Sequence, residues 1–303
     1  MSFGQQFGQM PDTLGPYRLI RLLGHGGMSQ VFLARRYGAS GFEKQVALKT
    51  LPVEQFGNET LTRSLIEEAK ICAGLNHRNL AQIYDLGVDE GIYYLCMEYI
   101  EGINLKSILT QQRPAVEVAL FIAQEVALAL DYIHSATDSE GRPLGLIHRD
   151  VSPSNILISR SGEVKLTDFG IAKATLLSDV TWGRFRKGTV AYMSPEQVRG
   201  ETLSSQSDQF GLGIVLTEML TGSRPFDGHG PAETLDRIRV AAPLDLQAAP
   251  TSLRPLLQKI LSLDPQQRFS TSRSLYESID NSKQAYPPAN PFTLQRLAQQ
   301  INP

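Results

Sequence analysis

Residues 147–170 have the sequence IHRDVSPSNILISRSGEVKLTDFG, and this stretch decides the fold. Two segments rich in aliphatic residues, 155–159 and 163–167, flank a turn that contains serine and glycine, so they predict a β-hairpin. Three side chains with oxygen atoms stand at the open end of this hairpin: Asp150, Asn155 and Asp168. We therefore expect the three side chains to converge at one place.

Such an arrangement has a specific chemical use. Carboxylate and amide oxygens are hard ligands that suit Mg²⁺ when the ion also contacts phosphate oxygens. A carboxylate beside such a site can orient a hydroxyl group and accept its proton. A single aspartate in a loop is more often a turn or cap residue, so the information lies in the ordered combination. His-Arg-Asp at 148–150, then Asn155, then Asp-Phe-Gly at 168–170 resembles the signature of the eukaryotic-like (Hanks-type) protein kinase superfamily, in particular bacterial Ser/Thr members.

The resemblance covers residues 15–282 and implies an α+β, bilobal protein-kinase fold. A small lobe at 15–100 would hold an antiparallel β-sheet with one helix, and a larger, mainly helical lobe would occupy 101–282. Residues 1–14 are rich in glycine and glutamine, which predicts a disordered N-terminal tail. The C-terminal tail, 283–303, carries apolar residues at helical spacing, so it either frays or docks on a surface, with self-association as a hypothesis.

The first part of the chain predicts a nucleotide site. Segments 17–23, 30–35 and 45–50 predict three antiparallel strands, and the first turn, LGHGGMSQV, is rich in glycine, whose amides can bond phosphate oxygens. With Val46-Ala47-Leu48-Lys49 after it, this turn resembles the nucleotide-covering loop and lysine-bearing strand of a kinase. The resemblance implies the following ATP-binding residues: Leu23, Gly24, His25, Gly26, Gly27, Val31, Ala47, Lys49, Met97, Glu98, Ile100, Asn155, Leu157 and Asp168.

Within this set the resemblance assigns individual roles. Val31 and Ala47 would flank the adenine ring, and Lys49 would bond the α- and β-phosphates. A helix predicted at 59–75 carries the glutamate that pairs with the lysine; spacing favours Glu68, with Glu67 as the alternative, because the two side chains project about 100° apart. Further strands are predicted at 80–88 and 92–97, joined by a turn at 89–91 and followed by the hinge at 98–100, with Met97 at the back of the pocket.

The catalytic roles follow in the same way. Asp150 would orient and deprotonate the substrate hydroxyl, while Asn155 and Asp168 would hold Mg²⁺, with Mn²⁺ as an alternative. Ser152 stands where many Ser/Thr kinases carry a lysine that touches the transferred phosphate, and Ser29 replaces the third glycine of the turn. The loss of a positive charge at residue 152 would slow phosphoryl transfer and weakens the assignment to Ser/Thr over Tyr specificity.

Residues 171–196 resemble an activation segment that ends in Ser194-Pro195-Glu196. Arg149 would pair with a phosphate on this segment and order it. Thr189 resembles the threonine that contacts the catalytic aspartate in Ser/Thr kinases. Autophosphorylation in trans would involve a homodimer. The phosphorylation candidates are, in order of preference, Thr181, Ser178 and Thr175.

Several residues have structural interpretations. Segment 116–135 predicts a long helix, and loop 136–146 a surface excursion. The segment at 207–220 is apolar almost all round, which predicts a buried helix. For Asp208 at its start, capping the helix is the plain interpretation, and the family resemblance implies that it also braces the backbone of the catalytic loop. Arg268 resembles the arginine that pairs with Glu196.

Composition limits the remaining possibilities. The 303 residues have a formal net charge of −2, which does not favour nucleic-acid binding. No apolar run is long enough to span a bilayer, and the N-terminus has no secretory pattern, so we expect a cytoplasmic location and no membrane partner in this chain. Cys72 and Cys96 are predicted to be buried structural thiols.

These observations favour an ATP- and Mg²⁺-dependent protein kinase that transfers the γ-phosphate to Ser/Thr hydroxyls of proteins in signalling and phosphorylates its own activation loop. The alternative is a catalytically weak pseudokinase that acts as a nucleotide-binding scaffold, supported by Ser152 and Ser29. A kinase of small molecules is a third interpretation, which the peptide-platform residues at 188–189 and 194–196 argue against.

Overall fold

The computed structural model describes residues 12–25, 30–51, 66–67, 69–169, 190–240, 242 and 244–301. The chain divides into two compact units. The first contains the described residues up to Asn76 together with Ala81–Tyr99, and the second contains His77–Leu80 and everything from Ile100 onward. The short segment 77–80 therefore packs with the second unit although its neighbours in sequence on both sides belong to the first.

The first unit is built on an antiparallel sheet with strand order β1-β2-β3-β4-β6-β5. The five predicted strands are confirmed, and each extends by one or two residues beyond a predicted end, but the strand predicted from residue 80 begins only at Ile83. Their bounds are β1 Thr13–Leu14, β2 Tyr17–His25, β3 Gln30–Tyr37, β4 Glu43–Thr50, β5 Ile83–Asp89 and β6 Ile92–Glu98.

The prediction of disorder through residue 14 is wrong at its C-terminal end. Thr13 and Leu14 form β1, which pairs with β2 through Leu14 and Tyr17. The Gly15 amide donates to the Asp89 carboxylate (2.6 Å), which ties the β1–β2 turn to the end of β5. Leu14 is only 1% exposed because it packs on one face of the sheet, and no local sequence pattern reveals that long-range contact.

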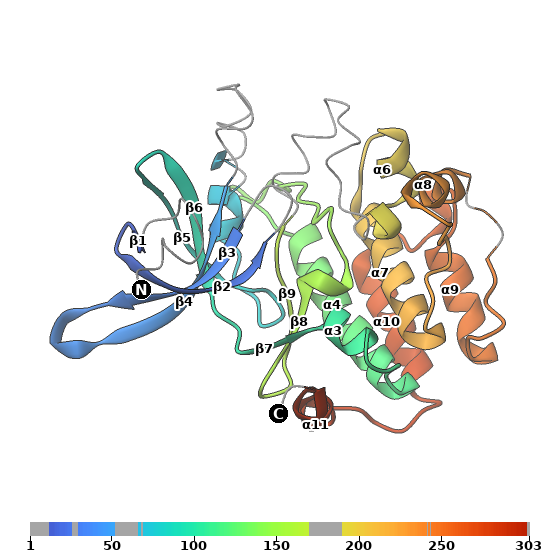
Figure 1. The fold of residues 1–303 in the computed structure, drawn as a ribbon. Coiled ribbons are helices and arrows are strands. Elements are labelled where there is room, and N and C mark those ends of the chain that lie inside the picture. The colour runs from blue at the N-terminus through green and yellow to red at the C-terminus, as the bar shows by residue number, and fades with distance from the viewer. Residues whose placement is uncertain are drawn as a thin grey trace. The chain divides into compact units, whose positions relative to one another are not determined.

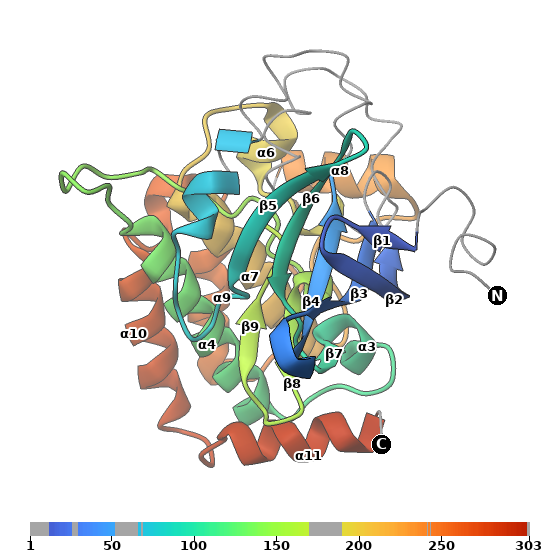
Figure 2. The same ribbon diagram turned by 90° about the vertical axis from the view of Figure 1, so that its left-hand side faces the viewer.

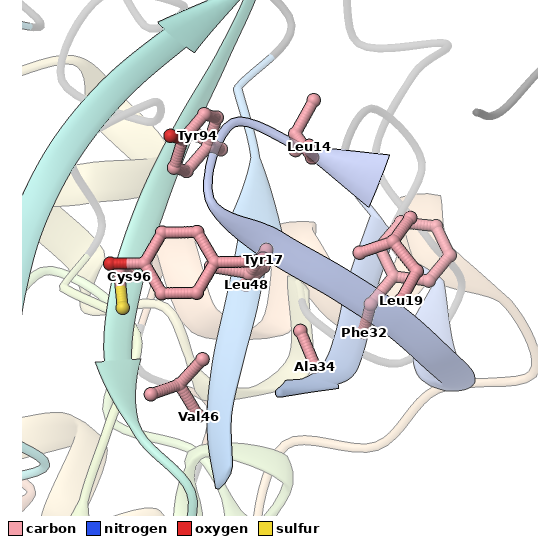
Figure 3. Close-up of a cluster of buried hydrophobic side chains, with 9 residues drawn as sticks. All are labelled: Leu14, Tyr17, Leu19, Phe32, Ala34, Val46, Leu48, Tyr94 and Cys96. Atoms are coloured by element: carbon pink, nitrogen blue, oxygen red, sulfur yellow. The ribbon is translucent and has the colours of Figure 1, made fainter. Parts of the chain in front are cut away.

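That face carries a dense apolar cluster, shown in Figure 3, to which β1, β2, β3, β4 and β6 all contribute. Tyr17 and Tyr94 meet edge to face with ring centroids 5.9 Å apart. Cys96 is buried beside Tyr17, and burial raises the pKa of its thiol, so it is a structural cysteine as predicted; Cys72 is buried as well. The cluster consists of Leu14, Tyr17, Leu19, Phe32, Ala34, Val46, Leu48, Tyr94 and Cys96.

Two further sequence predictions fall in this unit. Asp89 pairs with Ile92 across a two-residue turn in which Glu90 (φ 46°) and Gly91 (φ 82°) are both left-handed, as a type I′ hairpin requires. Residues 66–67 and 69–73 are helical, and Ala69 is buried, which fits the predicted amphipathic helix over its described part. Glu68 lies outside the described residues.

The second unit is mainly helical (Figure 1). Helices α4, α7 and α10 lie side by side, and α7 is buried over most of its length because its sequence is apolar on all sides. A small antiparallel sheet completes the unit, in the order β7-β8-β9. The elements are β7 Gly102–Asn104, α3 Leu105–Leu109, α4 Val116–His134, β8 Ile156–Ser159, β9 Val164–Leu166, α6 Pro195–Arg199, α7 Ser205–Thr221, α8 Pro231–Arg239, α9 Arg254–Ile260, α10 Ser272–Lys283 and α11 Pro291–Ile301.

None of the helices within the described ranges combines the length and the apolar character needed to cross a membrane. The predicted surface excursion at 136–146 folds back on itself, with a bridge between Thr137 and Pro143. The Asp138 carboxylate closes this loop by accepting from the Arg142 amide (3.0 Å) and the Arg142 guanidinium (2.7 Å).

The C-terminal tail docks rather than frays. Helix α11 lies against β8, beside the turn of the β8–β9 hairpin (Figure 2). Gly162 in that turn has φ 83°, and a Cβ atom there would lie 1.8 Å from the Pro291 carbonyl oxygen, so the two backbones are in direct contact. Leu294 and Ala298 form the buried stripe of α11. The helix therefore supports the hairpin at the end opposite to Asn155 and Asp168.

We predict that Leu294→Ala lowers the free energy of unfolding by about 3 kcal/mol, because it removes a leucine that is 0% exposed. Phe292→Ala on the same helix is the matched control, since Phe292 is 75% exposed and its loss should change stability by less than about 0.5 kcal/mol. Urea denaturation of the two variants measures the difference. Equal effects would show that α11 does not contribute through this contact.

Candidate active site

The predicted hairpin is confirmed, and its strands place the candidate catalytic residues at one end. Pro153–Asn155 form a single 3₁₀ turn directly before β8, and Asp168 follows β9 after one residue. Two backbone positions in this region are left-handed although neither is glycine: Arg149 (φ 66°) and Asp168 (φ 61°). Such conformations cost about 1–3 kcal/mol each and persist only where the surroundings hold them.

The Asp208 carboxylate holds the first of these positions. Its Oδ2 accepts from the His148 amide (2.7 Å), and its Oδ1 accepts from the Arg149 amide (2.7 Å). His134 Nε2 lies 2.8 Å from Oδ2 and supplies a third contact. Burial by itself would raise the pKa of Asp208, but the hydrogen bond and charge of His134 and the contacts of His148 hold it below its usual range.

Asp208 therefore braces the catalytic loop, and the interpretation of this residue as a helix cap is wrong. The N-cap of α7 is Ser204, which forms a capping box with Ser207: the Ser207 hydroxyl accepts from the Ser204 amide (3.3 Å). The physical reason is direction: one turn into the helix, the Asp208 side chain faces the loop of His148 and Arg149, about 60 residues earlier in sequence, whose two amides need acceptors.

His148 connects the catalytic loop to the segment before Asp168. Its Nδ1 accepts from the Asp150 amide (3.3 Å), so Nε2 carries the proton and donates to the Thr167 carbonyl (3.2 Å). Its ring packs against Phe169 with centroids 5.1 Å apart. Burial lowers the pKa of His148, against the opposing effect of Asp208, so the neutral ring is favoured.

Asn155 makes a second link between the loop that contains Asp150 and the segment before Asp168. Its side-chain Nδ2 donates to the Asp150 carbonyl (2.9 Å), and its own carbonyl accepts from the Thr167 amide (2.9 Å). Because the nitrogen end of the amide faces the loop, the oxygen end Oδ1 is the end that can face a cation. Asp168 lies next to Thr167 and supplies a carboxylate, so the donors present fit a hard divalent ion.

Four residues of the first unit that are predicted to bind the nucleotide lie on one face of the sheet: Val31, Ala47, Lys49 and Met97. Val31 pairs with Lys49 across β3 and β4, and Ala47 pairs with Met97 across β4 and β6. Directly paired residues of antiparallel strands lie on the same face, and so do residues two apart on one strand. This face is opposite to the cluster of Figure 3, so the sheet presents apolar side chains and a lysine together.

The remaining predicted residues are placed as follows. Leu23 and Gly24 lie near the end of β2, Glu98 ends β6, Ile100 opens the second unit, and Leu157 lies on β8. His25 ends β2, and only its backbone is described. The other predicted site residues lie outside the described residues: Gly26, Gly27, Glu68, Thr175, Ser178 and Thr181.

The predicted pair of Glu196 and Arg268 forms a buried, bidentate ion pair with distances of 2.7 and 3.0 Å. The Ser207 hydroxyl donates to Glu196 Oε1 as well (2.7 Å). Burial would raise the pKa of Glu196, but Arg268 and Ser207 hold it below its usual value. The pair ties α6 to the start of α7 and to the loop before α10.

Sequence reasoning missed two residues that support the site. Asn79 donates through Nδ2 to Glu125 on α4 (2.8 Å) and to the Val164 carbonyl (2.9 Å), so it holds β9. Gln197 on α6 donates to the Arg149 carbonyl (3.0 Å). Both are buried amides, and the bonds that their side-chain nitrogens donate reach partners at least 46 residues away in sequence, which no periodic pattern marks.

A family profile described as protein kinase domain matches residues 17–278, from the start of β2 into α10. The chain belongs to the protein kinase domain family. The kinase domain of Mycobacterium tuberculosis PknI, a solved structure, superposes with a TM-score of 0.67 at 26% identity and covers 89% of this chain and 97% of its own. The predicted kinase fold is thereby confirmed.

Two curated relatives of this kinase domain come from bacteria. The chain is 35% identical over 275 residues to the tyrosine-protein kinase MasK of Myxococcus xanthus, covering 88% of this chain and 43% of that protein. It is also 35% identical over 270 residues to the serine/threonine-protein kinase PrkC of Bacillus subtilis, covering 88% and 40%. The chain thus spans less than half the length of these relatives.

We predict that Asp208→Asn destabilises the protein by about 3 kcal/mol, because the amide group cannot accept from both loop amides and leaves a buried donor unpaired. Asp138→Asn is the matched control. That carboxylate also accepts from two backbone amides, at Glu140 and Arg142, but in an exposed loop where water replaces lost bonds, so its loss should be much smaller. Chemical denaturation compares the two, and similar losses would contradict the brace.

A second prediction concerns pH. Because the folded state lowers the pKa of His148, the unfolded state binds a proton that the folded state resists, so stability falls as pH falls through the ordinary histidine value of about 6.5. Between pH 7.5 and 5.5 we therefore expect the protein to lose stability, with His148 contributing to the loss. His148→Gln should flatten this dependence, whereas His229→Gln, at an exposed loop position, should leave it unchanged. An unaltered slope in His148→Gln would refute the assignment.

Proposed function

We propose that this chain is an ATP-dependent protein kinase that transfers the γ-phosphate to serine or threonine hydroxyls of protein substrates. The observation that carries the proposal is the loop in which Asp150, Asn155 and Asp168 are tied together through His148 and Thr167. Family membership supports it. Because the chain spans only part of its curated relatives, substrates, upstream signal and partners of the whole protein belong to the proposal.

In this proposal Asn155 Oδ1 and the Asp168 carboxylate hold Mg²⁺, with Mn²⁺ as an alternative. The ion, when bound, offsets the negative charge of the phosphate oxygens. Lys49 bonds phosphate oxygens, and the apolar side chains of Val31, Ala47 and Met97 on the same sheet face contact the adenine. Asp150 accepts a hydrogen bond from the substrate hydroxyl, which directs the oxygen and removes its proton.

Specificity for Ser/Thr is the finer part of the proposal. The relatives include one named a tyrosine kinase and one named a serine/threonine kinase, at the same 35% identity. Thr189 supports Ser/Thr specificity, whereas Ser152 in place of a lysine leaves tyrosine specificity as the second candidate. We further propose cytoplasmic signalling, where ATP is present, and autophosphorylation in trans within a homodimer, first at Thr181, then at Ser178 or Thr175.

Incubation with ATP and Mg²⁺, followed by intact-mass and peptide mass spectrometry, tests the function directly. We expect the wild-type chain to gain phosphate on serine or threonine in the segment that contains Thr181. Asp150→Asn should bind ATP about as well yet transfer at least about 10³-fold more slowly, because the group that accepts the hydroxyl proton is lost. Turnover that survives in Asp150→Asn would remove the role given to that residue.

The same experiment separates the alternatives. Phosphotyrosine in place of phosphoserine or phosphothreonine would favour the specificity of the MasK relative. ATP binding without transfer to the chain or to a generic basic protein would favour a nucleotide-binding scaffold. In that case Ser152→Lys is the first variant to assay, since it restores the positive charge.

A further inference from the structure

The amide side chain of Gln197 joins two parts of the second unit that are far apart in sequence. Gln197 is the third residue of α6, which begins at Pro195 after the cap residue Ser194. Its Oε1 accepts from the Ser194 amide (2.8 Å), and its Nε2 donates to the Arg149 carbonyl (3.0 Å). The side chain is 5% exposed, so both bonds are made out of contact with bulk water.

From this geometry we propose that Gln197 is a positioning residue for Asp150, an inference that rests on the kinase function proposed above. The peptide group between Arg149 and Asp150 is held at both ends. Gln197 bonds its carbonyl oxygen, and the Asp150 amide of the same peptide group donates to His148 Nδ1 (3.3 Å). The plane of this peptide sets the direction in which the Asp150 side chain leaves the backbone.

The conformation of Arg149 explains why a second support is needed. Its φ of 66° is a strained, left-handed value for a residue with a side chain. Asp208 holds the Arg149 amide (2.7 Å), and Gln197 holds the Arg149 carbonyl (3.0 Å). Without Gln197, the bond from the Asp150 amide to His148 Nδ1 (3.3 Å) still holds this peptide, but its carbonyl end is less constrained, because rotation about ψ of Arg149 moves the carbonyl without breaking the bond to Asp208.

Glutamine is suited to this position because one amide both accepts and donates. Glutamate at the same position of a helix forms the usual capping box and would keep the bond to Ser194, but an ionised carboxylate cannot donate to Arg149. Gln197→Glu therefore separates the two functions of the side chain. Gln197→Met removes both bonds and keeps a similar volume.

The test measures kcat and KM for ATP in wild type, Gln197→Glu and Gln197→Met. In Gln197→Glu we expect kcat to fall about tenfold at pH 7.5, equivalent to about 1.4 kcal/mol, with KM for ATP within about twofold and a lower melting temperature, because the buried carboxylate faces the Arg149 carbonyl without a hydrogen bond. Gln197→Met should lose kcat and melt lower. Thr271→Ala removes a capping box on α10 that does not bond the catalytic loop, so it should lower the melting temperature and leave kcat unchanged.

A pH profile adds a readout that a purely structural role would not move. When the introduced carboxyl group is protonated, its O–H can donate to the Arg149 carbonyl again, so kcat of Gln197→Glu relative to wild type should rise as pH falls from 8 to 6. A folded Gln197→Glu with kcat within twofold of wild type at every pH would overturn the proposal while leaving the kinase function intact.

Hydrogen exchange tests whether Gln197 holds the loop at 147–152 without requiring enzymatic turnover. Loss of the Gln197 bond should speed exchange in the peptide covering 147–152 about tenfold in Gln197→Glu and Gln197→Met, and not in Thr271→Ala. A wild-type chain that transfers no phosphate would refute the proposed function, and the exchange data would still test the contact. Equal protection of this peptide in all four proteins would overturn the positioning role.

Discussion

The buried Asp208 carboxylate is the interaction on which the catalytic loop depends. It lies on α7, which is enclosed by apolar side chains, so its charge must be satisfied by protein donors. Two consecutive amides and one histidine supply them. A single carboxylate that binds two consecutive amides fixes the orientation of the two peptide groups on either side of His148, and this helps to hold Arg149 in a left-handed conformation next to Asp150.

From Asp208, further hydrogen bonds connect the loop to the other candidate catalytic residues. His148 bonds to Thr167, Asn155 links Asp150 to Thr167, and Asp168 is the next residue along the chain. Each bond contributes about 1 kcal/mol alone, but the bonds share partners and lie in a buried environment, so they support one another. Asn79 holds the hairpin by donating to the Val164 carbonyl on β9, and α11 holds it at its turn.

Local patterns predicted most of the fold and the order of the site. The β8–β9 hairpin, strands β2 to β6, α4 and α7 were predicted from local patterns, and the pairing of Glu196 with Arg268 was predicted from the family resemblance. The errors share one cause. Burial of Leu14, the direction of Asp208 and the bonds of Asn79 and Gln197 depend on residues distant in sequence, and periodicity reports only which face of a single element is apolar.

At Ser152, the effect of side-chain charge can be distinguished from an effect on the shape of the loop. The side chain is 5% exposed, and the Ser152 carbonyl accepts from the Asn155 amide (3.0 Å), which closes the turn that places Asn155 before β8. That contact uses only the backbone and is open to any residue type, so a serine there preserves the shape of the loop. The absence of a lysine therefore changes the electrostatic field at the proposed phosphate site and not the position of Asp150 or Asn155. An effect of this residue on rate or specificity is for that reason an electrostatic effect.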